Sequence, residues 1–423
     1  MSQQEYRFPL QVGKDGRLLR DSAGKAFLYQ ADTPWMLFLN CTPEETARYV
    51  RKRHEQGFTA LQLQLTGFLG MKNRDGQLPF HGDQDFARPN EAYFAVVDRH
   101  IDVLTAQGLY LHIAPAWSGC CGEGWAGTNK DGSPKPLNAN GREKCHAFGK
   151  WLGKRYADRE NIGWFLGGDN DPWNAREEIE ALALGLKETA PRHLLSYHAA
   201  STHSSTDVFP DARWLDVCMT YTYFRGFSKA WNRVQPDVHE VSEAERRKTP
   251  PRPFFLGEST YEGEHGDWGS AWQVRKQAWE SVLGGATGHA YGSSDWKMES
   301  GWEQRLDRPG ARSMKPLKTL LERIGWENLR PVSAGSESEA GLTITPNPVG
   351  RNDFAPSAVR EDGKAALVYL PTPRTIRQTR SWSRAHWFDP TNGTESDAGT
   401  GQEWTPAAKN AGGDRDWVLV LER

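Results

Sequence analysis

The sequence predicts an α/β protein, a (β/α)8 TIM barrel followed by a C-terminal antiparallel β-sandwich. Short β-rich runs alternate with longer amphipathic helical stretches from residue 27 to about 325, a pattern typical of parallel βα units. Eight such runs occur, which is the number of strands that a closed barrel needs. After Arg330 the chain changes to short alternating runs separated by Asp-Gly, Asn-Gly and Gly-Gly turns, which favours a small all-β domain.

The predicted elements follow one another in that order along the chain. Residues 1–25 contain K-D-G and S-A-G turns and predict a hairpin that leads into the barrel. The barrel strands are expected to begin near Phe27, Thr59, Leu109, Ile162, His193, Asp216, Pro253 and Ala286. Strands of the second domain are expected at 365–370, 384–388 and 416–421. We therefore assign residues 1–332 to the barrel with its hairpin and residues 333–423 to the β-sandwich.

Two barrel helices have clear sequence signals. Thr42 precedes Pro43, Glu45 stands three residues after the threonine, and Gly57 marks a stop, which predicts a capped helix. A second helix is expected over 90–108. Its apolar residues recur with helical spacing and form one stripe that faces a sheet: Tyr93, Val97, Ile101 and Leu104.

Composition excludes several classes of function. Lys and Arg number 52 against 54 Asp and Glu, so the net charge of −2 offers no basic surface for nucleic acid or an anionic membrane. The sequence shows neither a signal peptide nor an apolar run of about 18 residues, which predicts a soluble, cytoplasmic protein. The 18 tryptophans indicate flat apolar surfaces of the kind that line sites for large polar ligands.

The metal-binding and redox-active residue types show no functional spacing. The five cysteines lack a C-x-x-C pair, so we expect reduced thiols at Cys41, Cys120, Cys121, Cys145 and Cys218. The histidines show no ligand spacing, which argues against a metal site. Neither G-x-G-x-x-G after the first strand nor G-x-x-x-x-G-K occurs, so no nucleotide or other cofactor is expected.

Two carboxylates stand where a barrel carries its chemistry, at the carboxyl ends of strands. Asp169 follows the run Trp164 to Gly168, and Glu258 follows Phe254 to Gly257. In both places a glycine precedes the acid, and we expect it to let a sugar-sized ligand approach the backbone. Paired carboxylates are what glycoside cleavage requires. The structural alternative is that each acid caps the next helix or pairs with an arginine.

The surroundings suggest how the two acids divide the work. Asp169 is followed by Trp173 and preceded by Trp164, and apolar walls keep a carboxyl protonated, so it is the expected acid/base. Glu258 is the expected nucleophile. Asp171 lies two residues after Asp169 and leaves open which of these carboxylates faces the sugar.

Other strand ends carry aromatic, amide and acidic residues that suit sugar rings and hydroxyls. Each also has a structural interpretation: core packing for a tryptophan, a satisfied partner for a histidine or a glutamine. Asp32 is favoured as functional, because a buried carboxylate at a barrel mouth is costly without a role. The expected substrate-binding residues are Asp32, Trp35, Gln62, Gln64, Trp117, Asp171, His198, Tyr221, Tyr223, Tyr291 and Trp296.

Four stretches together carry a resemblance to a known family. They are 24–35 with D-T-P-W, 53–64, 164–169 with G-G-D, and 257–258 with G-E. In this combination the chain, from about residue 8 to 423, resembles the apiosidase-like glycoside hydrolases, a barrel followed by a β-sandwich sometimes labelled a collagen-binding domain. The resemblance implies a retaining hydrolase with Asp169 as acid/base and Glu258 as nucleophile. It also implies terminal branched or unusual sugars, such as apiose in plant cell-wall pectin.

We therefore predict a retaining glycoside hydrolase that removes a terminal sugar, such as an apiosyl or another pentofuranosyl unit, from plant-derived glycosides or oligosaccharides. A carbohydrate is the expected partner, with no nucleic acid, no membrane and no cofactor; the oligomeric state is open. One alternative is a non-catalytic carbohydrate-binding protein on the same scaffold. Another is a metal-dependent barrel hydrolase, which chelators would inhibit.

Overall fold

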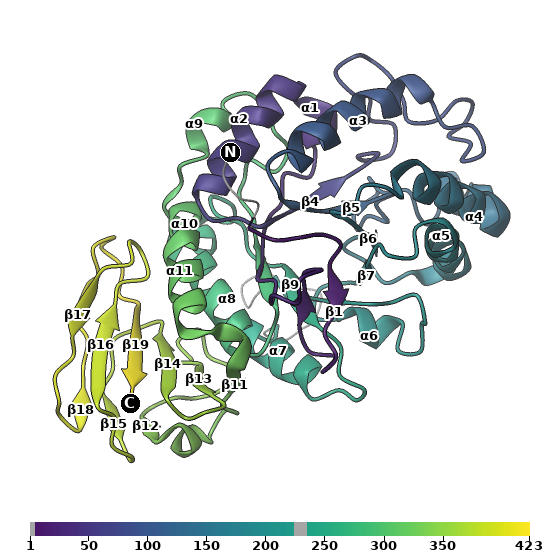
Figure 1. Ribbon diagram of the computed structural model, residues 1–423. Coiled ribbons are helices and arrows are strands. Elements are labelled where there is room, and N and C mark those ends of the chain that lie inside the picture. The colour runs from purple at the N-terminus through teal and green to yellow at the C-terminus, as the bar shows by residue number, and fades with distance from the viewer. Residues whose placement is uncertain (1–4, 224–234) are drawn as a thin grey trace.

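A computed structural model describes residues 5–223 and 235–423 of the chain. Figure 1 shows a barrel of strands surrounded by helices, joined to a separate pair of sheets that carries the C-terminus. This arrangement confirms the predicted α/β barrel with a C-terminal antiparallel sheet domain.

The barrel is one sheet of eight parallel strands in the order β7-β6-β5-β4-β3-β10-β9-β8. The two outer strands of that order close on each other, because the backbone N–H of Asp216 and of Val217 donates to the carbonyl of Leu195 at 2.9 and 3.2 Å. Every strand begins within two residues of its predicted position. The bounds are β3 (Tyr29–Asp32), β4 (Ala60–Gln64), β5 (Tyr110–Ala114), β6 (Ile162–Gly167), β7 (Leu195–His198), β8 (Cys218–Tyr221), β9 (Phe254–Glu258) and β10 (Gly288–Tyr291).

Helices cover the outside of the barrel. The predicted capping box is present: the backbone N–H of Glu45 donates to Thr42 Oγ1, and the backbone N–H of Thr42 donates to the Glu45 carboxylate. The helices are α1 (Leu37–Asn40), α2 (Pro43–Glu55), α3 (Glu91–Thr105), α4 (Pro136–Tyr156), α5 (Arg176–Thr189), α6 (Ser205–Val208), α7 (Val238–Arg246), α8 (Ala271–Leu283), α9 (Trp302–Arg305), α10 (Pro309–Arg312) and α11 (Met314–Ile324). Short 3-10 helices span Trp173–Ala175, Gly266–Gly269, Trp326–Asn328 and Glu337–Ala340.

The predicted apolar stripe of the second helix is confirmed. Asn90 caps α3, and Tyr93, Val97, Ile101 and Leu104 are all buried. The predicted N-terminal hairpin is also present as β1 (Gln11–Val12) and β2 (Leu19–Arg20), which pair antiparallel.

The barrel interior is a packed core, so a ligand meets the barrel at its mouth. Tyr29 stacks on Phe255 with ring centroids 4.0 Å apart. His112 lies between the Tyr29 hydroxyl and the Ser196 hydroxyl, each 3.0 Å from a ring nitrogen. These contacts join alternate strands of the sheet, β3 with β5 and β9 and β5 with β7, and fill the barrel below its carboxyl end.

The C-terminal domain consists of two antiparallel sheets that enclose an apolar core. Val368 and Leu419 from one sheet and Ile376 and Trp404 from the other belong to this core. The first strand of the larger sheet precedes the predicted domain boundary at residue 332. The larger sheet has the order β11 (Leu329–Pro331), β13 (Ser357–Arg360), β14 (Ala365–Leu370), β19 (Trp417–Glu422), β16 (Arg384–Phe388) and β17 (Glu395–Asp397), and the smaller β12 (Leu342–Ile344), β15 (Ile376–Gln378) and β18 (Glu403–Trp404).

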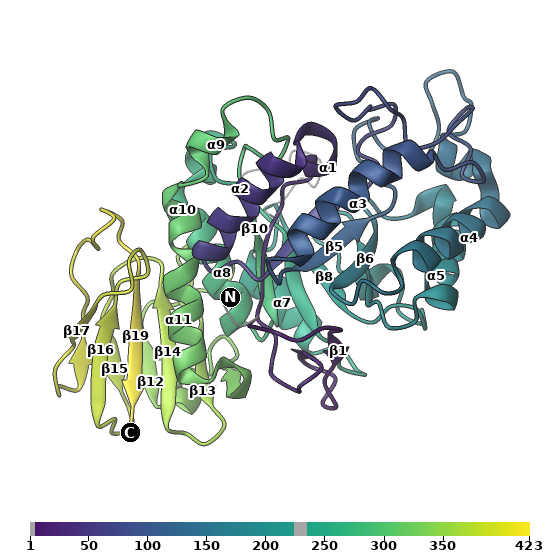
Figure 2. The same ribbon diagram turned by 45° about the horizontal axis from the view of Figure 1, so that its top comes forward.

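The two domains share an extensive interface. Figures 1 and 2 both place α8 and α11 between the barrel and the larger sheet. Trp279 of α8 stacks on Tyr369 of β14 at 5.9 Å, and the Arg275 guanidinium pairs with the Asp416 carboxylate at 2.8 Å. Both charged groups are buried, so each depends on the other for compensation.

The described helices include none that is both apolar and long enough to cross a membrane.

Candidate active site

A pocket of about 480 Å³ opens at the carboxyl end of the barrel strands. Its walls are rich in aromatic rings and contain three carboxylates. The lining residues are Trp35, Gln64, Phe68, Trp117, Cys120, Cys121, Asp169, Ser201, Tyr221, Tyr223, Gln235, Glu258, Tyr261, Glu264, His265 and Trp296.

Asp169 and Glu258 enter this pocket from different strands. Asp169 comes two residues after β6, and Glu258 is the last residue of β9. One carboxylate oxygen of each, together with a nitrogen of His198, forms a group whose members lie within 4.8 Å of one another. The two carboxyl groups therefore share one small space, which is the arrangement that acid–nucleophile chemistry needs.

The turn that delivers Asp169 depends on two glycines. Gly167, Gly168 and Asp169 all have positive φ, at 84°, 125° and 56°. A Cβ on Gly168 would lie 2.4 Å from the Trp117 ring, and one on Gly257 would lie 2.3 Å from the Met219 methyl. The expectation that these glycines leave room for a sugar is wrong, because protein side chains fill the space beside them.

Glu258 contacts a histidine on one side and a tyrosine on the other. Nε2 of His198 lies 2.8 Å from its Oε2. The Tyr261 hydroxyl bonds to the same carboxylate. Because Trp35 Nε1 donates to the Tyr261 oxygen at 2.7 Å, the Tyr261 proton is free to point at Glu258.

Burial disfavours charge on both carboxyl groups, but to different extents. Burial, followed by the negative charge of Glu258, raises the pKa of Asp169 to about 8. Burial raises the pKa of Glu258 to about 7, against the hydrogen bond from Tyr261, which lowers it. Glu258 therefore ionises first, and when the pair carries a single proton, that proton is on Asp169.

The third carboxylate of the pocket, Glu264, was not anticipated from the sequence. Trp296 Nε1 donates to its Oε1 at 2.8 Å, and the Tyr223 hydroxyl donates to its Oε2 at 3.2 Å. Glu262, only two residues away, is instead buried and accepts the Tyr291 hydroxyl at 2.7 Å and the Gly310 N–H at 2.9 Å. Sequence could not separate the two acids, since both lie in the same loop after β9.

The pocket lining contains part of the expected set. The rings of Trp35 and Trp117 have centroids 5.2 Å apart, and both line the pocket. The structure brings together eight expected residues: Trp35, Gln64, Trp117, Asp169, Tyr221, Tyr223, Glu258 and Trp296. The lining residues that were not expected to bind substrate are Phe68, Cys120, Cys121, Ser201, Gln235, Tyr261, Glu264 and His265.

Five expected residues lie outside the pocket lining. Asp32 is buried in an ion pair with Arg53 at 2.5 Å and accepts the Tyr49 hydroxyl, so its carboxylate is already compensated by the protein. The other four also lie elsewhere: Gln62 is buried in the barrel, Asp171 pairs with His203 at 2.9 Å, His198 contacts Glu258, and Tyr291 bonds to Glu262.

The expectation of reduced thiols is wrong at Cys120 and Cys121, which a disulfide joins. The Glu123 carboxylate accepts the backbone N–H of both residues, at 3.0 and 2.8 Å. This tight turn brings the two adjacent sulfur atoms together at the pocket wall. Cys41, Cys145 and Cys218 are buried free thiols, as expected.

Among the residues that the structure describes, three groups have the donor types of a metal site, and each has an internal explanation. Asp169, His198 and Glu258 form the carboxyl pair with its histidine. In the group of Asp237, His239 and Glu280, the Lys276 ammonium lies 2.8 Å from Asp237 and 3.0 Å from Glu280, where it supplies the positive charge. In the third group, Glu123 lies beside the Cys120–Cys121 disulfide, which offers no thiolate to a metal. The absence of a metal stays a prediction.

Comparison with known proteins identifies the family of the barrel domain. Residues 13–328 match the family model described as "Apiosidase-like, catalytic domain". The fold is similar to a glycoside hydrolase family 5 protein from Bacteroides vulgatus, with a TM-score of 0.82 and 24% identity over 98% of this chain and 93% of that chain. A second structure, described as a glycoside hydrolase, has the same TM-score and identity and covers 98% and 96%.

A more distant likeness is to an exo-β-1,4-mannosidase from an Opitutaceae bacterium, with a TM-score of 0.52, 14% identity, and coverage of 66% of this chain and 54% of that chain. At these identities the likeness concerns the fold. No curated protein matches the sequence.

Proposed function

The chain belongs to the family of apiosidase-like catalytic domains and is a glycosidase, and on this premise we propose that it removes a terminal sugar with retention of anomeric configuration. The observation that carries the proposal is the pair of Asp169 and Glu258 in one pocket, with unequally raised pKa values. Unequal pKa values separate an acid from a nucleophile.

The first step forms a covalent intermediate. A Glu258 carboxylate oxygen attacks the anomeric carbon, the glycosidic C–O bond breaks, and the Asp169 proton moves to the leaving oxygen. This step needs Asp169 protonated and Glu258 ionised. The higher pKa of Asp169 supports that distribution of the proton.

The second step releases the sugar. The ionised Asp169 takes a proton from water, the water oxygen bonds to the anomeric carbon, and Glu258 leaves as a carboxylate. Retaining glycosidases have carboxyl groups about 5–5.5 Å apart and inverting ones about 6.5–9.5 Å. Carboxylate oxygens of Asp169 and Glu258 within 4.8 Å of each other support retention.

The sugar is expected to lie against the aromatic wall, with its hydroxyls bonded by Gln64 and Glu264. The Gln64 Oε1 is buried and accepts no hydrogen bond from the residues that the structure describes, so a sugar hydroxyl would satisfy it. We propose a terminal apiosyl or other pentofuranosyl unit from a plant-derived glycoside or oligosaccharide, because the matching family model takes its name from apiose release.

The test compares wild type with Glu258→Gln on aryl glycosides that include apiofuranosides and arabinofuranosides. Glu403→Gln is the control, since this glutamate is half exposed on the C-terminal domain. Wild type and the control should release the aglycone, whereas Glu258→Gln should fall to background. The anomer that forms first, observed by NMR, should match the substrate. The opposite anomer would refute retention, and no turnover on any glycoside would refute the function.

A further inference from the structure

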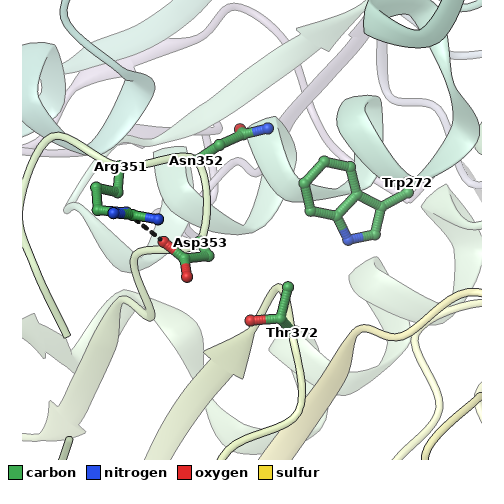
Figure 3. A pocket seen from close by; sticks show the side chains of 5 residues that line it. All are labelled: Trp272, Arg351, Asn352, Asp353 and Thr372. Atoms are coloured by element: carbon green, nitrogen blue, oxygen red, sulfur yellow. Dashed lines mark ion pairs between the residues drawn. The ribbon is translucent and has the colours of Figure 1, made fainter. Parts of the chain in front are cut away.

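A second cleft lies between the barrel and the C-terminal domain, outside the catalytic pocket. It has a volume of about 480 Å³ and is lined by Trp272, Arg351, Asn352, Asp353 and Thr372. Trp272 belongs to the first turn of α8, and the other residues belong to the C-terminal domain. Figure 3 shows the indole on one side and the polar side chains on the other.

The indole is fixed so that its ring surface is what remains for a ligand. Trp272 Nε1 donates to the Pro371 carbonyl at 2.9 Å, so the polar atom of the ring is already satisfied by the protein. A ring held in this way offers apolar surface to the C–H face of a sugar.

The opposite wall offers amide, carboxylate and hydroxyl groups. The Oδ1 atom of Asn352 is buried and accepts no hydrogen bond within the described part of the chain. Arg351 and Arg374 lie 3.5 and 3.4 Å from the Asp353 carboxylate, which compensates its charge. Arg374 also donates to Thr372 Oγ1 at 2.9 Å, so the Thr372 proton is free to donate elsewhere.

The position of the cleft relates it to the catalytic pocket. The connection from β9 to α8 carries Glu264 and His265 of the pocket, then Trp268 with 39% of its surface exposed, and then Trp272. Since α8 starts at the barrel face where β9 ends, the cleft lies at the same end of the barrel. One loop therefore links both sites.

We propose that this cleft is a second carbohydrate subsite, which binds a neutral sugar unit of the substrate remote from the cleaved bond. An aromatic face combined with amide, carboxylate and hydroxyl groups is the chemistry that recognises a polyhydroxylated ring. Because Arg351 and Arg374 already compensate the Asp353 carboxylate, these groups require no charge on the sugar. This proposal rests on the proposed function for the identity of the substrate, and a second point of contact raises the affinity for a chain above that for a single unit.

The first test measures binding of neutral β-linked xylan, mannan and galactan oligosaccharides by calorimetry, on a Glu258→Gln background. For each oligosaccharide that binds, the additional substitution Trp272→Ala should lower the affinity about tenfold, as expected from loss of one stacking contact. Val349→Ala, at an exposed residue that does not line the cleft, is the control and should not change affinity. Equal affinities with and without the indole would overturn the proposal.

Two further variants separate stacking from a structural effect. Trp272→Phe keeps a ring but loses the bond to Pro371, so it should retain most of the affinity. Equal losses in the Phe and Ala variants would refute stacking. Thr372→Ala should also weaken binding, and its side chain is small enough to remove without opening the interface.

Kinetics distinguish this proposal from the proposed function. Trp272→Ala should reduce kcat/KM on an oligosaccharide about tenfold more than on an aryl glycoside. If wild type cleaves neither substrate, the proposed function fails, while calorimetry still decides the subsite. If wild type cleaves both substrates and Trp272→Ala lowers kcat/KM equally on both, the subsite proposal is overturned and the proposed function stands.

Discussion

Nε2 of His198 lies 2.8 Å from Oε2 of Glu258, and Nδ1 of the same ring accepts the backbone N–H of Asp169 at 3.2 Å. One buried imidazole therefore contacts both residues of the carboxyl pair. Nδ1 also lies 3.2 Å from the Ala199 carbonyl oxygen, so either ring nitrogen can carry the proton of the neutral ring. Burial lowers the pKa of His198, which keeps the ring neutral.

This contact predicts that His198 is a positioning residue for the nucleophile. His198→Phe keeps the ring contacts with Trp117 and Tyr221 but removes the ring nitrogen beside Glu258. We expect kcat to fall about ten- to hundredfold, the worth of a polar contact to a charged group, and the acidic limb of the pH profile to move to higher pH. His146→Phe, on the exposed surface of α4, is the control. An unchanged acidic limb would refute the role.

The pH dependence of kcat/KM should be bell-shaped and narrow, with its maximum between the two pKa values. Activity should fall as the pH drops below about 7, because Glu258 gains a proton and can no longer attack. It should also fall as the pH rises above about 8, because Asp169 loses the proton that it donates. A profile that stays flat from pH 6 to about pH 9 would contradict this assignment.

Removal of the acid should depend on the leaving group. Asp169→Ala should lower kcat about 10²–10⁴-fold on a substrate with an alkyl leaving group, which needs a proton. The loss should be much smaller on dinitrophenyl glycosides, whose leaving group departs without one, and the alkaline limb should disappear. Asp171→Ala is the matched control, because its carboxylate pairs with His203 outside the pocket. Equal losses on both substrates would argue against an acid/base role.

The proximity of Asp169 and Glu258 could be predicted because each acid lies at or just after the end of a strand, and strand ends converge at one face of a barrel. Glu264 and Tyr261 could not, since they lie in a loop whose path no periodicity describes. Asp32 occupied a strand end as well, but its partner Arg53 comes from α2, and sequence spacing does not reveal a pair formed between a strand and a helix. The same limit applies to Tyr291 and its partner Glu262.

The cysteines provide a prediction that needs no substrate. Burial raises the pKa of Cys41 and of Cys145 to about 12, and that of Cys218 well above its usual value, so these thiols should not react in the folded protein. A colorimetric thiol reagent should therefore detect no fast-reacting thiol until a reductant opens the Cys120–Cys121 disulfide, and then two. A Cys120→Ser/Cys121→Ser variant should show none under either condition. Fast reaction before reduction would contradict the disulfide.

Asp32 should matter for stability rather than for binding sugar. Its ion pair with Arg53 is almost completely buried, and Asp32→Asn would leave the guanidinium without its counter-charge. Breaking a buried pair on one side costs about 3–5 kcal/mol, so urea unfolding should show a loss of that size in the free energy of unfolding. Where the variant is still folded, KM should be close to that of wild type, because the Asp32 side chain does not line the catalytic pocket.

Asp102→Asn is the control for that measurement, because its ion pair with Arg159 lies on the exposed surface and should contribute little. Gln64→Ala gives the opposite pattern, since the Gln64 amide lines the pocket: KM should rise while the free energy of unfolding changes less than in Asp32→Asn. If Asp32→Asn instead raised KM and left stability unchanged, its carboxylate would have to reach the sugar. That outcome would require Arg53 to find another partner for its charge, although its present contacts besides Asp32 are the Tyr49 hydroxyl, the Gln56 amide oxygen and the Leu306 carbonyl.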